Sequence, residues 1–117
     1  MHYSFMIFGH NRIPIVGWLR AQADESLAHA VLAGQQVTAL GRHPSLQIGK
    51  LLDTRTHKVD EILTEAPSHE QHGLDQYHTL LELVAGRSVM LEEYAREQIA
   101  AEEHHQVEFR KMLRRPD

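Results

Sequence analysis

Residues 88–113, SVMLEEYAREQIAAEEHHQVEFRKML, contain the pattern that decides the fold of this chain. Their apolar residues recur at alternating spacings of four and three, which is typical of the buried face of an α-helix. Two polar residues, Glu102 and His105, interrupt this face where burial costs free energy unless something offsets it. The full face consists of Leu91, Ala95, Gln98, Glu102, His105, Phe109 and Met112.

A second helix is predicted upstream, over about residues 57–85 and ending at Gly86. Pro67 lies inside this segment, and proline is expected to kink or split a helix because it lacks a backbone N–H. Glu70 is the polar residue on the predicted inward face, so this helix also turns a carboxylate toward the core. The face consists of Val59, Leu63, Ala66, Glu70, Leu74, Tyr77, Leu81 and Val84.

The N-terminal half contains another long helical pattern, from about Pro14 to Leu40, with Gly41 as its stop. Glu25 and His29 lie in the middle of its predicted inward face, about 40° apart around the helix axis. Residues 2–10 are predicted to be the tail of a helix, and residues 42–56 to form a long connection that crosses a bundle.

The composition favours one all-α domain, residues 1–117, because glycine, proline and aromatic residues are few. The net charge of -4 with scattered basic residues argues against nucleic acid as a partner. The apolar start, Met1 to Phe8, is too short to span a membrane and lacks the features of a signal peptide. We therefore expect a cytoplasmic protein without a membrane partner.

The three interrupted faces together predict a metal site. Each contributes one carboxylate, from Glu25, Glu70 and Glu102, and converging carboxylates in a dry interior are strongly disfavoured without a cation. The chain has ten histidines and no cysteine, so imidazole and oxygen are the available ligands. These suit iron, manganese or zinc, and bridging carboxylates would suit two ions.

Glu102-Glu103-His104-His105 matches the Glu-x-x-His motif of di-iron carboxylate bundles. The sequence resembles the bacterioferritin and ferritin-like family in residues 23–30 (ADESLAHA), 69–84 (HEQHGLDQYHTLLELV) and 92–113 (EEYAREQIAAEEHHQVEFRKML). This resemblance implies a left-handed four-helix bundle with a long crossover between the second and third helices. The metal ligands that it implies are Glu25, His29, Glu70, Glu102 and His105.

The sequence departs from the family pattern at several points. Ser26 stands where the Glu-x-x-His motif of the second helix would place its glutamate, because Glu25 and His29 are four residues apart. The first-helix carboxylate would lie upstream of Met1, so we expect a truncated first helix. Leu27 lies near the position of the haem-binding methionine in the family, so no haem is expected.

Two functions follow as alternatives from these observations. One is a ferroxidase-type enzyme with a di-iron site, serving iron oxidation and storage or detoxification. The other is a ferritin-like scaffold that binds one metal or none and acts as an assembly or interaction module. In both cases a homo-oligomer, a dimer or larger, is expected to cover the apolar stub around Tyr3, Phe5, Met6 and Phe8. Tyr77 is predicted to be a core residue with a paired hydroxyl.

Overall fold

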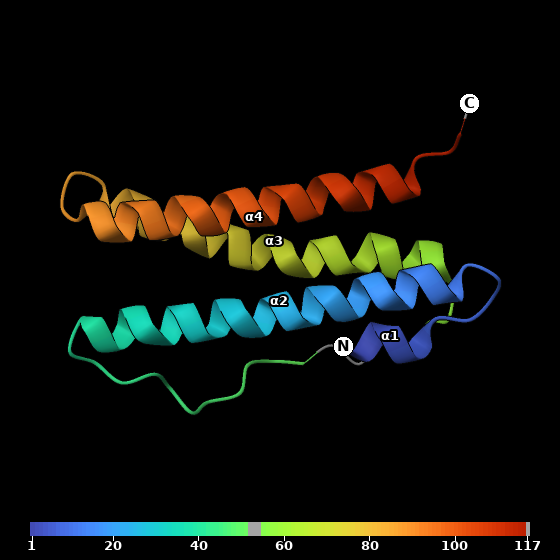
Figure 1. The fold of residues 1–117 in the computed structure, drawn as a ribbon, viewed down its shortest axis with the longest axis horizontal. Helices are drawn as coiled ribbons and strands as arrows, with labels where there is room; N and C mark the ends of the chain where they lie inside the picture. The colour runs from blue at the N-terminus through green and yellow to red at the C-terminus, as the bar shows by residue number, and fades with distance from the viewer. Residues whose placement is uncertain (52–54, 117) are drawn as a thin grey trace. The chain divides into compact units, whose positions relative to one another are not determined.

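The computed structural model describes residues 1–51 and 55–116, which form two compact units, residues 1–59 and 60–117. Within the described residues the secondary structure consists of four helices and no strand, so the predicted all-α class is confirmed (Figure 1). No helix in these two ranges combines the length and apolar composition needed to cross a membrane. The helices are α1 (His2–Met6), α2 (Arg12–Ala39), α3 (Val59–Val84) and α4 (Val89–Leu113).

The first unit begins with the short helix α1, which lies against α2. Gly9 occupies the turn between them with φ of 104°, a conformation that glycine adopts without the steric cost of a side chain. Ser4 of α1 is fully buried, and its hydroxyl accepts a hydrogen bond from Nε of Arg20 at 3.3 Å. The predicted helical tail is therefore only five residues long, and it is fixed to the first third of α2.

A long connection follows α2, as predicted. It starts after Leu40, where Gly41 takes φ of 74°, and its residues up to 51 run back along α2 (Figure 1). Near the far end of this connection, Nδ1 of His57 lies 2.7 Å from the carbonyl oxygen of Met6. The His57 ring also stacks on Phe8, with ring centroids 4.0 Å apart. The connection thus returns to the α1–α2 turn before α3 begins.

The second unit is an antiparallel hairpin of α3 and α4 (Figure 1). Gly86 in the tight turn has φ of 73°, which favours glycine. Ser88 is the N-cap of α4, and its hydroxyl accepts a hydrogen bond from the backbone N–H of Leu91 at 3.3 Å. This bond satisfies one of the N–H groups that a helix start leaves without an intrahelical partner. The start of α4, and with it the register of its inward face, is fixed by the cap.

Six of the nine buried apolar side chains of the hairpin lie on the predicted faces, and Ile62, Tyr94 and Ile99 lie beside them. Each large apolar side chain removed from water contributes roughly 1.5 to 3 kcal/mol to folding. Pro67 does not split α3, which continues through it to Val84, so of the two expected effects the split is wrong and the kink stays a prediction. Buried residues on both sides of Pro67, together with a 3.3 Å hydrogen bond from Nε2 of Gln106 to its carbonyl oxygen, favour the continuous helix. The buried apolar residues are Ile62, Leu63, Ala66, Leu74, Leu91, Tyr94, Ala95, Ile99 and Phe109.

Candidate metal centre

The inward faces of α3 and α4 carry ionisable side chains between buried apolar ones. Glu70 lies on α3 between Ala66 and Leu74, and it is half-buried. On α4, Glu102 and His105 are half-buried and lie between the buried residues Ile99 and Phe109. The helical spacing puts these side chains on the same faces as the core, which is why they are not free to turn fully into water.

The structure brings these three residues together. One ligand atom from each of Glu70, Glu102 and His105 lies within 4.8 Å of the other two. Nδ1 of His105 is 3.6 Å from Oε2 of Glu102, and the two side chains are only 13% and 16% exposed. We call Glu70, Glu102 and His105 the carboxylate–histidine cluster.

The cluster has the chemistry of a divalent-cation site. Two carboxylates in a half-buried position repel each other, and a cation between them offsets both the repulsion and the loss of hydration. Carboxylate oxygens with one imidazole nitrogen suit iron, manganese and zinc, and sulfur ligands are excluded because the chain has no cysteine. The residues present therefore fit a metal ion of this class, with three protein ligands from two helices.

Glu25 and His29, also predicted as ligands, lie on α2 in the first unit. Oε1 of Glu25 is 3.7 Å from Nε2 of His29, and these side chains are 40% and 17% exposed. Among the described residues of this unit, no third histidine or carboxylate joins them in a group that could hold a metal. Their membership in the same site as the carboxylate–histidine cluster stays a prediction.

A pair of tyrosines lies beside the cluster. Tyr77 of α3 meets Tyr94 of α4 edge to face, with ring centroids 6.1 Å apart. Burial raises the pKa of the Tyr77 hydroxyl above its usual range, and the hydrogen bond with Tyr94 and the nearby charge of Glu102 raise it further. Tyr77 therefore stays a neutral phenol at physiological pH, in agreement with the predicted paired hydroxyl.

Two residues of this region were not assigned to the site from the sequence. Tyr94 is next to Ala95, which the helical period selected for the inward face, so its contact with Tyr77 was not foreseen. Gln98 is on the predicted face and is only 3% exposed. A polar side chain at a core position, one turn before Glu102, is the sequence feature from which Gln98 could have been assigned to the site.

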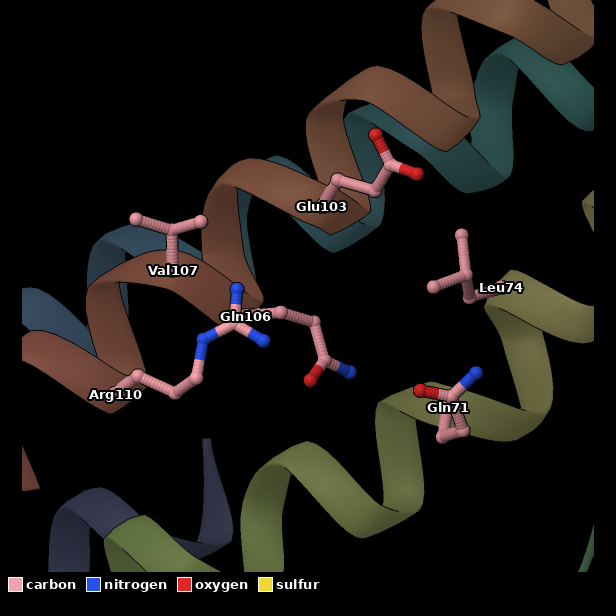
Figure 2. Close-up of a pocket in the computed structure, with 6 residues that line it drawn as sticks. All are labelled: Gln71, Leu74, Glu103, Gln106, Val107 and Arg110. Carbon is pink, nitrogen blue, oxygen red and sulfur yellow. The ribbon is translucent and has the colours of Figure 1, made fainter.

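A pocket between α3 and α4 in the second unit lies beside the carboxylate–histidine cluster and does not include its residues. Its volume is about 340 Å³. Figure 2 shows the side chains that line it. Three of its lining residues directly follow the three cluster residues in sequence, and consecutive residues of a helix point about 100° apart. The pocket therefore lies on the flank of the hairpin, one face away from the cluster. It is lined by Gln71, Leu74, Glu103, Gln106, Val107 and Arg110.

The fold and the cluster define an all-helical protein with a carboxylate–imidazole group on its buried faces. The family model described as ferritin-like domain matches residues 1–117, the whole chain. The chain thus belongs to the ferritin-like family, and its predicted ferritin-like fold class is confirmed. No curated protein and no solved structure matched it in the same comparisons.

Proposed function

We propose that this protein binds Fe(II) at the carboxylate–histidine cluster and supports iron oxidation, as part of iron storage or detoxification. The observation that carries the proposal is the convergence of Glu70, Glu102 and His105 from two helices to within 4.8 Å. Membership in the ferritin-like family supports iron as the metal. A bacterioferritin-type di-iron site is the specific form that we propose.

In this proposal the residues have distinct roles. Glu70 and Glu102 supply the negative charge that attracts Fe(II), and a carboxylate shared by two ions would hold them a few Å apart. His105 and His29 each supply a neutral nitrogen ligand, and Glu25 completes the set. Two Fe(II) substrate ions release one electron each, and a hydrogen peroxide molecule accepts both electrons with two protons to give two water molecules. Dioxygen is the alternative oxidant.

The proposal includes metal ions and a second copy of the chain as partners. Phe5 and Phe8 near the N-terminus are 61% and 59% exposed, and exposed aromatic side chains of this size favour contact with another protein surface. A homo-oligomer, a dimer or larger, is the form that we expect.

A second candidate is a ferritin-like scaffold that binds a single metal without two-iron chemistry. It is favoured by the number of ligands in the carboxylate–histidine cluster, because three protein ligands satisfy one ion with open positions for water. Such a protein would serve as a binding or assembly module. The two candidates differ in stoichiometry and in oxidation, so one experiment separates them.

The experiment is anaerobic loading of the purified chain with Fe(II), followed by metal analysis and then by addition of peroxide or dioxygen. Close to two irons per chain, with an absorbance change at a rate well above that of free Fe(II), would support the di-iron proposal. A sample saturated with Zn(II) beforehand is the matched control, because zinc competes for the same ligands and has no redox chemistry. One iron or none, with oxidation at the background rate, would favour the scaffold.

A further inference from the structure

The side chain of Gln98 is a polar feature of the inward face of α4 that packing does not explain. Gln98 is 3% exposed, and its amide oxygen Oε1 is buried without a hydrogen-bond partner among residues 1–51 and 55–116. A buried acceptor that forms no hydrogen bond destabilises the fold, and an apolar side chain of similar size would avoid the cost. The amide oxygen therefore needs a partner that the described protein atoms do not supply.

The position of Gln98 places it next to the carboxylate–histidine cluster. It lies four residues before Glu102 on α4, and side chains at this spacing are neighbours with β-carbons about 5 to 6 Å apart. Side chains of an α-helix also lean toward its N-terminus, so Glu102 leans over the turn that contains Gln98. No hydroxyl group among the described residues explains the amide, because none of them donates a hydrogen bond to Oε1 of Gln98.

We propose that Gln98 is a further residue of the metal site, and that its amide oxygen is a ligand of the cation held by Glu70, Glu102 and His105. This inference rests on the proposed function, because it requires that the cluster binds a metal. Amide oxygens are accepted ligands of hard divalent cations, together with carboxylates and water. The cluster would then offer four protein ligands in place of three.

The charge of such a site supports a neutral fourth ligand. Two ionised carboxylates balance one divalent cation, and neutral His105 and Gln98 add ligand atoms without adding charge. A third carboxylate at position 98 would leave the half-buried site with a net negative charge, which a low-dielectric surrounding disfavours. The amide therefore adds a ligand atom without this electrostatic cost to the metal-free protein, whereas a glutamate would lower the stability of the metal-free state and not the affinity for the cation.

The test is anaerobic titration of the full chain with Co(II), by calorimetry and by the visible d–d absorption spectrum. Gln98→Leu is expected to weaken Co(II) binding roughly tenfold or more and to change the spectrum, because one oxygen ligand is lost. The same variant is expected to unfold at a higher temperature without metal, since a buried acceptor has been removed. Gln98→Glu, which keeps an oxygen in place, is expected to bind Co(II) at least as tightly as the wild type.

Gln36→Leu is the matched control. The amide oxygen of Gln36 on α2 is also buried without a hydrogen-bond partner among the described residues. This variant is expected to raise thermal stability in the same way while leaving Co(II) affinity unchanged. Should Gln98→Leu bind Co(II) with wild-type affinity and spectrum, the inference is overturned and Gln98 is not a ligand. Failure of the wild type itself to bind Co(II) would overturn the proposed function and this inference together.

Discussion

The chain contains two glutamate–histidine pairs with nearly the same distance between their side chains but with different surroundings. Glu25 and His29 on α2 are 3.7 Å apart, and Glu102 and His105 on α4 are 3.6 Å apart. The glutamate of the α2 pair is 40% exposed, whereas that of the α4 pair is 16% exposed. A third ligand, Glu70 from the neighbouring helix α3, joins only the α4 pair within the described part of its own unit.

The comparison shows that spacing along one helix does not by itself create a metal site. A pair four residues apart whose glutamate is largely accessible to water, as in Glu25 and His29, contributes about 0.2 to 0.5 kcal/mol to a helix. A half-buried pair that meets a second carboxylate carries a desolvation and repulsion cost that a cation relieves. The neighbouring helix, through Glu70, is what distinguishes the second case.

The largest expected effect is a difference in metal affinity between variants of the two pairs. Glu102→Ala is expected to weaken Zn(II) binding by more than about 100-fold, because loss of a direct ligand exceeds the roughly 10- to 100-fold effect of residues that only support ligands. Glu25→Ala is expected to weaken the first binding event by less than about tenfold. Isothermal titration calorimetry measures both, and circular dichroism is expected to show nearly unchanged helix content.

Equal losses in the two variants would break the comparison. That result would mean that α2 contributes as strongly as α4 to one shared site, as the bacterioferritin-type arrangement requires. Unchanged metal content in Glu102→Ala would instead contradict the carboxylate–histidine cluster as the binding site.

The two pairs also show which features of the site can be predicted from the sequence and which cannot. Helical periodicity predicted the three long helices and the core positions of α3 and α4 that carry Glu70, Glu102 and His105, because burial of one face is encoded in residue spacing. It did not reveal that Oε1 of Gln98 has no hydrogen-bond partner in the described part of the chain, because that depends on the positions of every neighbouring atom. Of the kink or split expected at Pro67, the split was wrong, because tertiary packing of α3 outweighs the local cost of proline.

A smaller effect is expected at the helix starts that orient the two pairs. The Ser88 hydroxyl caps α4, whereas Asn11 at the start of α2 makes no side-chain capping hydrogen bond. Ser88→Ala is therefore expected to lower the free energy of unfolding by about 1 kcal/mol. Asn11→Ala is expected to change it by less than about 0.5 kcal/mol. Urea denaturation of both variants measures the contrast, and equal destabilisation would show that the cap geometry does not distinguish the helices.

The smallest expected effect concerns pH and the surroundings of the α4 pair. Burial, the Tyr94 hydrogen bond and the Glu102 charge raise the pKa of Tyr77 above its ordinary value of 10.0. Above that value the unfolded chain loses the phenol proton while the folded chain keeps it, so the unfolded state binds fewer protons. The contribution of Tyr77 to stability is therefore complete below pH 10 and is lost as the pH rises toward its folded-state pKa.

Tyr77→Phe removes this titration, so the metal-free variant should lose less stability than the wild type between pH 9 and about pH 11. Urea denaturation in the presence of a chelator measures the two slopes, and lysine titration affects both chains equally. Tyr94→Phe should give an intermediate slope, because it removes one cause of the raised Tyr77 pKa and leaves the burial and the Glu102 charge. If stability fell with pH equally in the wild type and both variants, Tyr77 would be as well hydrated in the folded protein as in the unfolded state. The half-buried surroundings of Glu102 and His105 would then not extend to Tyr77, which lies one heptad after Glu70 on α3.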